Sequence, residues 1–327
     1  MSSERSGSNL LRILLSNHPH IHSAPAPHFL TIFHPIISSY GDLSDRKNAE
    51  KLLLDMAAFV SDDGTAWDFK FDLKALYDEF QPKSFLDCFH LFYAASAREK
   101  KKRKFVVKEN NLFDFAFHML HYYREPKFIY LYRDPRDYTA SWMRLSHNTL
   151  TPYRAALRWA SEQEKCDELI HGFNLKAHPI RYEELISNTE QVMQGALRYI
   201  DEPDTKLCYE VDTERTARFA WNESWANIAK PIMKNNHNQY RCFLKNKDIR
   251  IVESVTKAPL LKLGYTLETR ADWKPSRMFL WKDRVEEKIK CLRAGMGRNR
   301  TKDFLSMKRG LVKSIRVRVK SEAGAKR

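Results

Sequence analysis

The 327-residue chain contains 56 Lys and Arg residues against 41 Asp and Glu residues, a formal net charge of +15. Its hydrophobic content of 43% and aromatic content of 12% exclude an intrinsically disordered chain and predict one large α/β domain or two small ones. The sequence has no apolar run of 18 residues and no apolar leader, so we expect neither a transmembrane span nor a signal peptide.

The five cysteines are scattered along the sequence and include no C-x-x-C pair. Free thiols in a reducing compartment are the simplest interpretation, which predicts a cytoplasmic protein. His18, His20 and His22 alternate, but no cysteine or further histidine follows at zinc-finger spacing. We therefore expect no metal site.

The positive charge is concentrated at the C-terminal end. Residues 281–327 hold 16 basic against 5 acidic residues, a net charge of +11, whereas the first 280 residues hold 40 against 36. This contrast predicts a folded domain over residues 1–270 and a flexible or loosely helical basic extension over 271–327. Such an extension either contacts an anionic membrane surface, glycan or nucleic acid, or is simply solvated. A second basic run, residues 98–104, is a solvated loop or the entry of an anionic acceptor.

A short polar loop opens the chain and leads directly into an apolar helix start at Leu10; it consists of Arg5, Ser6, Gly7, Ser8 and Asn9. Backbone N–H groups at a helix start, together with a glycine and small hydroxyl residues, are typical of an anion-binding site. The loop lacks the spacing of a kinase-type phosphate loop, because the next glycine after Gly7 is Gly41.

Only three residues precede Glu4, whereas a strand leading into such a loop needs about five. We expect that the native start lies upstream or that most of a first strand is missing. Further along, the apolar spacing predicts an amphipathic helix over 45–60, and residues 61–97 are aromatic and helix-prone, as expected of a substrate-side insertion. A short strand at 105–107 and a helix at 111–124 follow.

A second anion-binding corner is predicted around residues 128–141. The apolar run 128–132 indicates a buried strand, which stops at Arg133. Asp134 is a good helix N-cap and Pro135 suits the first helical position. Ser141 lies two turns into that helix, where its hydroxyl faces the same corner. An ordinary strand–helix joint with a surface salt bridge is the competing interpretation.

The remaining pattern predicts a helix over 152–170, a strand over 179–185 and a helix over 189–200. Alternating strands and helices imply a parallel sheet with ligands bound at the carboxyl ends of the strands.

The loop from Arg5 to Asn9, combined with Arg133 and Ser141 eight residues apart, resembles the two nucleotide-binding motifs of sulfotransferases that use 3′-phosphoadenosine 5′-phosphosulfate (PAPS), in their bacterial-type branch. The resemblance covers roughly residues 2–268. It implies a P-loop-type parallel sheet flanked by helices, with the first loop holding the 5′-phosphosulfate and Arg133 and Ser141 holding the 3′-phosphate. Tyr182 matches the tyrosine that packs on the adenine. Lys234, His237 and Arg241 are candidate phosphate contacts.

The resemblance also suggests catalytic roles. Arg5 would stabilise the charge that develops on the leaving nucleotide, and Lys108 would hold the sulfonate. A general base is less evident, because Asn110 and Ala26 occupy the positions where relatives carry His or Glu. The remaining candidates for the base are His28, His34 and Glu109, with His28 preferred.

We therefore expect a metal-free sulfotransferase with PAPS as co-substrate and a hydroxyl or amine acceptor, small or glycan, with a carbohydrate or glycolipid favoured. It would be cytoplasmic or peripheral at the inner membrane, without a specific nucleic-acid partner. A kinase-like transferase, a non-enzymatic basic protein that binds membrane or nucleic acid, and a catalytically inactive relative are the alternatives.

Overall fold

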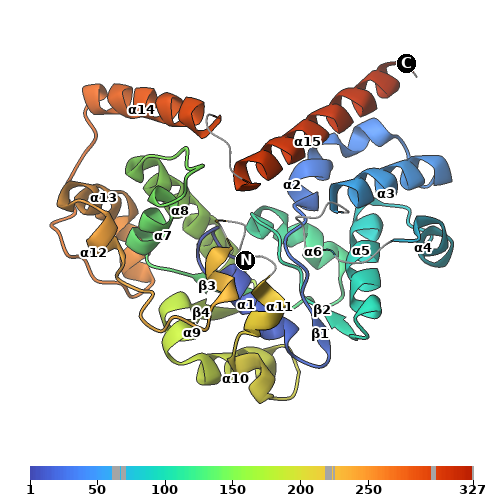
Figure 1. Ribbon diagram of the computed structural model, residues 1–327, viewed down its shortest axis with the longest axis horizontal. Helices are drawn as coiled ribbons and strands as arrows, with labels where there is room; N and C mark the ends of the chain where they lie inside the picture. The colour runs from blue at the N-terminus through green and yellow to red at the C-terminus, as the bar shows by residue number, and fades with distance from the viewer. Residues whose placement is uncertain (61–66, 68–70, 218–222, 224, 296–299, 326–327) are drawn as a thin grey trace.

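The computed structural model describes residues 1–60, 67, 71–217, 223, 225–295 and 300–325 (Figure 1). Helices dominate, and η denotes a 3-10 helix except for η3, which is a π-helical turn. The first elements are α1 (Ser8–Ser16), β1 (Ile21–His22), α2 (Phe29–Phe33), η1 (His34–Tyr40), α3 (Arg46–Val60), α4 (Leu73–Phe80), α5 (Phe85–Glu99), β2 (Lys104–Phe105), η2 (Leu112–Phe115), α6 (Ala116–Tyr122), β3 (Phe128–Tyr132) and α7 (Pro135–Met143).

The second half of the chain contributes mainly helices, and the chain ends in two long ones. Its elements are α8 (Pro152–Asp167), η3 (Glu168–Gly172), β4 (Ala177–Arg181), α9 (Tyr182–Ser187), α10 (Thr189–Tyr199), η4 (Lys206–Tyr209), α11 (Thr213–Thr216), η6 (Ala226–Ala229), α12 (Tyr240–Phe243), α13 (Asn246–Lys262), α14 (Arg277–Gly295) and α15 (Arg300–Ala325).

All paired strands among the described residues are parallel, as the alternating pattern predicted, but they form two separate small sheets. β1 pairs with β2, and β3 pairs with β4 in the register Phe128↔Ala177 to Tyr132↔Arg181. The expected strand over 179–185 is shorter at its end, because Tyr182 already begins α9. Glu183 and Glu184 occupy the first turn of that helix, where negative charge is favourable.

A cavity of about 610 Å³ separates the two sheets. It is lined by apolar side chains of α1, β1, β2 and β3, including Leu11, Ile21, Phe105 and Phe128. The start of the chain lies at its edge. Ser2 pairs with Leu131 through a single parallel bridge, and the Met1 ammonium donates to the Ile129 carbonyl at 2.6 Å. The expectation of a longer first strand stays a prediction.

The main core lies in the helical half and is rich in aromatic side chains. Phe29 and Phe33 of α2 pack edge to face, and Phe29 also packs against Phe92 of α5. The helix expected over 45–60 is α3. Of the expected insertion, residues 61–66 and 68–70 lie outside the described residues, and the remainder forms α4 and α5.

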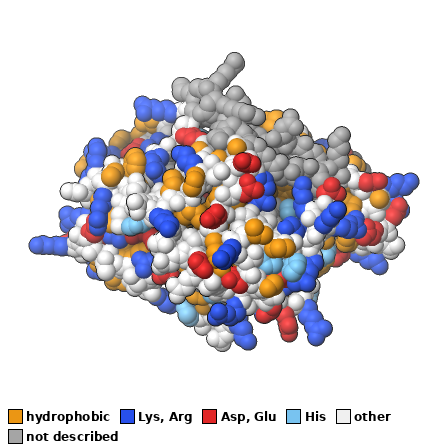
Figure 2. All heavy atoms as spheres, turned by 60° about the horizontal axis from the view of Figure 1, so that its bottom comes forward, with side chains coloured by type: hydrophobic (Ala, Val, Ile, Leu, Met, Phe, Trp, Pro, Cys, Tyr) orange, Lys and Arg blue, Asp and Glu red, His pale blue; other side chains and the backbone are white. Residues whose placement is uncertain are grey.

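The basic extension contains two helices, α14 and α15. Helix α15 packs on α3 and η1 (Figure 1), with Ile315 and Val319 buried. Arg318 pairs with Asp55, which also accepts a bond from the Tyr40 hydroxyl at 2.7 Å. On the face of the molecule in Figure 2, basic and acidic side chains are interspersed. None of the helices that the structure describes is long and apolar enough to cross a membrane, and all five cysteines are free.

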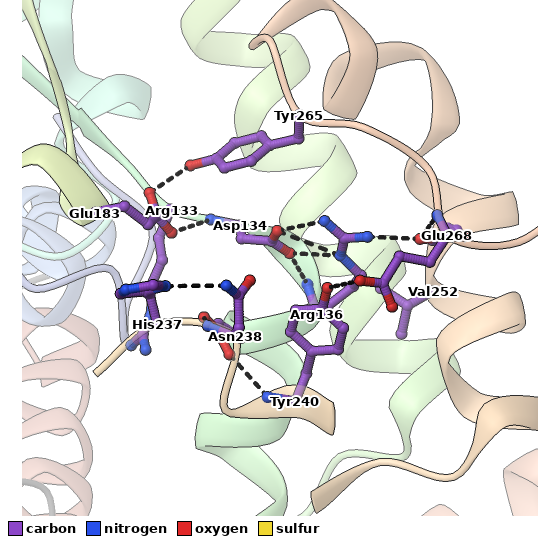
Figure 3. A network of polar contacts seen from close by, with 12 residues as sticks. Arg133, Asp134, Arg136, Glu183, His237, Asn238, Tyr240, Val252, Tyr265 and Glu268 are labelled. Atoms are coloured by element: carbon purple, nitrogen blue, oxygen red, sulfur yellow. Dashed lines mark hydrogen bonds and ion pairs between the residues drawn. The ribbon is translucent and has the colours of Figure 1, made fainter. Parts of the chain in front are cut away.

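The joint between β3 and α7 has the predicted N-cap, because the Asp134 carboxylate accepts a bond from the Arg136 N–H at 2.8 Å. The Arg136 guanidinium is buried between Asp134, at 2.6 Å, and Glu253 of α13, at 2.7 Å (Figure 3). One residue on, the Asp137 carboxylate accepts backbone bonds from Asn238 and Tyr240 at 2.7 and 2.9 Å. The start of α7 is thus fastened to the C-terminal segment.

We predict that Arg136→Ala lowers the free energy of unfolding by about 3–5 kcal/mol, because it leaves two buried carboxylates without a cation. Urea denaturation would measure the loss. Arg250→Ala is the matched control: Arg250 and Asp272 form an exposed pair, for which about 0–1 kcal/mol is expected. Equal losses for the two variants would contradict a structural role for the buried network.

Candidate active site

The loop before α1 has an unusual backbone conformation. Arg5 and Gly7 both lie in the left-handed region, with φ values of 65° and 93°. For a residue with a side chain, this conformation costs roughly 1–3 kcal/mol and is concentrated at functional sites. Gly7 occupies the N-cap position of α1 and no side chain caps the helix, so the first-turn N–H groups lack a side-chain acceptor.

Glycine is required at position 7 for a second reason, which is the close approach of Tyr182. A Cβ atom added to Gly7 would overlap the Tyr182 ring. The ring in turn lies under the Arg133 guanidinium, 4.3 Å from its centroid, and its hydroxyl accepts a bond from the Asn236 amide at 2.7 Å. Tyr182 is thereby held between the loop and the segment that follows η6.

The structure brings the two predicted anion-binding corners together, although they are more than 120 residues apart in sequence. Arg5 Nε donates to the Ser141 hydroxyl at 3.1 Å, and Arg133 Nη1 donates to the Arg5 carbonyl at 3.1 Å. Arg133 Nη2 also donates to the Asn236 carbonyl at 3.3 Å. One guanidinium therefore links the first loop, the β3–α7 corner and the C-terminal segment.

These residues surround a cavity of about 120 Å³, here called the arginine-lined cavity. Most of the cofactor-binding residues predicted from the sequence line it: Arg5, Gly7, Ser8, Asn9, Arg133, Ser141 and Tyr182. Ser6 does not line it; it is buried, and its hydroxyl has no hydrogen-bond partner. The Arg133 Nε atom is likewise buried without a partner. Unpaired buried polar atoms are costly and mark a place for a further polar group.

The electrostatics of the cavity favour an anion. Burial lowers the pKa of Arg5 to about 10, and the charge of Arg133 contributes. Burial and Arg133 also lower the pKa of Arg144, a third guanidinium at the cavity. Glu223 lines the cavity too, but its carboxylate accepts bonds from the Ser146 N–H and hydroxyl. Bringing guanidinium groups together is unfavourable unless a negative ligand offsets their repulsion.

Sequence reasoning missed several cavity residues and included others that lie elsewhere. Arg144, Asn227, Lys230 and Asn236 line the cavity, but no motif marks them. Arg241 is not among the lining residues; it is exposed, and its Nε donates to Glu268 at 3.0 Å. Lys234 and His237, the other candidates from this segment, are not among them either. The charge of these three residues therefore did not predict which side chains of this segment line the cavity.

A second polar group adjoins Arg5 and is here called the Lys108 cluster; it consists of Glu4, His28, Lys108, Asn110 and Arg158. Lys108 Nζ donates to the Asn110 side chain at 2.8 Å, and the Asn110 amide donates to Glu4. Arg158 Nη2 lies 3.5 Å from the other Glu4 oxygen. Because Glu4 directly precedes Arg5, this cluster is continuous with the loop.

The charges of the cluster set the protonation of His28 and Lys108. Burial lowers the pKa of His28 to about 4, with Lys108 contributing and Glu4 opposing. Burial also lowers the pKa of Lys108 to about 8. At neutral pH, His28 is therefore neutral and able to accept a proton, while Lys108 is still largely charged.

The two other candidates for a general base have different surroundings. Glu109 is buried, and its Oε1 accepts the Phe29 N–H at 3.0 Å, so it caps the start of α2 directly after His28. His34 packs edge to face against Phe115 and His118. His28 and Glu109 both lie close to Lys108, because the charge of Lys108 acts on the pKa of each.

The basic run at 98–104 is partly held by an ion-pair group. Glu202 is buried and lies 2.8 Å from Lys104 and 3.1 Å from Arg103. His18 and His20 place ring nitrogens near the same carboxylate. Burial by itself raises the pKa of Glu202, but the hydrogen bonds from Lys104, His20 and Arg103 outweigh burial and lower this pKa to about 2. Lys104 and Arg103 thus balance the charge of this carboxylate.

The comparisons with known proteins identify the family. A model described as "Sulfotransferase family" matches residues 1–206, which is more than half of the chain, so the chain belongs to the sulfotransferase family. A search of curated proteins found no match.

Two solved structures share the fold. The sulfotransferase domain from the curacin biosynthetic pathway is 20% identical, with a TM-score of 0.54 over 81% of this chain and 96% of that domain. The sulfotransferase domain from the Synechococcus PCC 7002 olefin synthase is 20% identical, with a TM-score of 0.52 over 77% of this chain and 91% of that domain.

We predict that Glu109→Gln makes the protein less sensitive to alkaline pH. Burial raises the pKa of Glu109 to about 8 from an ordinary value of 4.5, so the folded state binds this proton more tightly than the unfolded state does. Between those two pH values wild-type stability falls as pH rises, by at most about 1.4 kcal/mol per pH unit. Gln keeps the acceptor for the Phe29 N–H. Urea denaturation at pH 5 and pH 8 should show that the free energy of unfolding of the variant rises relative to that of the wild type as pH increases. A difference between the two proteins that is the same at both pH values would refute the prediction.

Proposed function

We propose that this sulfotransferase uses PAPS and transfers its sulfonyl group to a hydroxyl or amine of an acceptor. The observation that carries the proposal is the convergence of Arg5, Arg133 and Ser141 at one small cavity. Two anion-binding turns that meet in this way suit a ligand with two separate phosphate groups on one nucleoside.

In this proposal the loop Arg5–Asn9 and the start of α1 hold the 5′-phosphosulfate, while Arg133 and Ser141 hold the 3′-phosphate. The bond between Arg5 and Ser141 would be exchanged for bonds to ligand oxygens. Tyr182, with one edge fixed by Asn236, offers an aromatic surface for the adenine. Arg144 and Lys230 supply further positive charge at the same cavity.

Sulfonyl transfer needs positioning and charge stabilisation more than covalent chemistry on the enzyme. The acceptor oxygen or nitrogen bonds to sulfur as the bond between sulfur and the bridging phosphate oxygen breaks, leaving 3′-phosphoadenosine 5′-phosphate. Arg5, charged at neutral pH, stabilises the negative charge on the departing phosphate. Lys108 holds the sulfonate oxygens, and neutral His28 takes the acceptor proton. Glu4 positions Lys108 through Asn110.

The acceptor reaches this centre from the helical half, because His28 begins α2 and Lys108 follows β2. A carbohydrate or glycolipid hydroxyl remains our preferred acceptor. The rival kinase-like transferase predicts a requirement for Mg²⁺, whereas sulfonyl transfer does not. Activity that survives EDTA therefore favours the sulfotransferase, and activity that EDTA abolishes would favour the kinase-like alternative.

We predict that Arg133→Ala and Ser141→Ala each weaken binding of 3′-phosphoadenosine 5′-phosphate at least tenfold, about 1.4 kcal/mol. Both changes remove a group that would contact the 3′-phosphate. Isothermal titration calorimetry measures the affinity. Arg241→Ala is the control, because Arg241 is exposed and paired with Glu268 outside the cavity; its affinity should stay within twofold. Unchanged affinity in both test variants would reject the proposed site.

We predict that His28→Ala lowers kcat about 100-fold or more, as expected for loss of a general base. His34→Ala is the matched control and should keep kcat within about threefold. Release of 3′-phosphoadenosine 5′-phosphate from PAPS, with octyl glucoside as a hydroxyl-bearing acceptor, gives the rate. Nucleotide affinity should not change in either variant. A larger effect from His34 than from His28 would overturn the assignment of the base.

A further inference from the structure

Helix α14 is attached to the rest of the protein through polar contacts and through Phe279, which packs edge to face against Tyr153 and Trp273. Asp283 is buried, lies 2.7 Å from Arg154 of α8 and accepts a bond from the Thr151 hydroxyl. Lys290 donates to the Leu150 carbonyl at 2.9 Å, and Glu287 lies 3.6 Å from Arg154. Residues 283, 287 and 290 share one helix face. The acidic side chains of this face are therefore directed toward the protein.

The opposite face of α14 is apolar and exposed. Met278, Trp281, Val285, Ile289 and Leu292 follow one another at helical spacing, and Met278, Trp281 and Leu292 are 65%, 64% and 71% exposed. This set is here called the α14 stripe. A surface helix normally has the reverse orientation, with its apolar face inward. A contiguous exposed stripe of this kind marks an interaction surface.

The charges beside the stripe indicate what the surface contacts. With 3.6 residues per turn, Arg277, Arg284 and Lys288 border one side of the stripe, and Lys282 and Arg293 border the other. All five are exposed. An apolar stripe with Trp and Leu, bordered on both sides by long cationic side chains, is the arrangement of a helix that lies in a membrane interface.

Helix α15 presents a second exposed basic row: Arg309, Lys313, Arg316 and Lys320, spaced by four, three and four residues. α14 and α15 lie along the same edge of the molecule in Figure 1. A second copy of the chain suits the α14 stripe less well, because two such helices face to face would bring their cationic borders together.

We propose that α14 binds the surface of a bilayer that contains anionic lipid. The α14 stripe inserts between the lipid headgroups, while the cationic residues beside the stripe and the basic row of α15 contact lipid phosphates. The surface is separate from the arginine-lined cavity, so this inference does not depend on the proposed function. It gives the protein a fixed orientation on a membrane.

Co-sedimentation of the full chain with phosphatidylglycerol-containing vesicles tests the proposal. We expect binding that falls steeply with added salt and is at least tenfold weaker on pure phosphatidylcholine. Trp281→Glu should reduce binding at least tenfold. Leu207→Glu is the matched control: Leu207 is 59% exposed on η4, away from the stripe, and its change should leave binding intact.

Three outcomes would overturn the proposal: equal binding to both vesicle types, equal loss in the two variants, or self-association that Trp281→Glu abolishes in sedimentation velocity without vesicles. Urea denaturation of Trp281→Glu, measured in parallel, reports on its folding. A variant with wild-type stability and lost vesicle binding would support the membrane role.

Discussion

The guanidinium of Arg133 holds the site together. It donates to the carbonyl of Arg5 and to that of Asn236 while it lies on the Tyr182 ring. The three segments joined in this way precede α1, start α9 and follow η6, and Tyr182 adds its own contacts with Gly7 and Asn236. A planar group with five donors in fixed directions can make these contacts at once, which an ammonium cannot. Its unpartnered Nε shows that the set is still incomplete.

Directly after Arg133 in the chain, a buried ion network holds the start of α7 in position. Arg136 pairs with Asp134 (Figure 3) and with Glu253, and Glu253 also accepts the backbone N–H groups of Glu268 and Thr269. A buried ion network stabilises the fold little more than apolar side chains of the same size would. Its hydrogen bonds, however, form in few alternative geometries. The network thus restricts the geometry of the corner, as the proposed two-phosphate site would need.

The sequence correctly predicted those structural features that depend only on residues close together in the chain. Strand β3, the Asp134 cap and helix α3 follow from apolar spacing and capping chemistry over a few residues. The convergence of Arg5 with Ser141 was predictable only through family resemblance, because it depends on contacts between distant segments. Glu109 caps α2 and Arg241 bonds to Glu268 because of residues that are distant in sequence, and no sequence motif predicts such contacts. The α14 stripe was overlooked because the basic composition of the extension obscured its apolar spacing.

The position of Met1 has a practical consequence. Its ammonium already occupies a backbone acceptor of β3, and its side chain lines the cavity between the two sheets. A residue added ahead of Met1 would replace the ammonium that now donates to the Ile129 carbonyl by a peptide N–H. Because Ser2 already pairs with Leu131 in parallel, a designed strand placed ahead of Met1 could extend this pairing along β3.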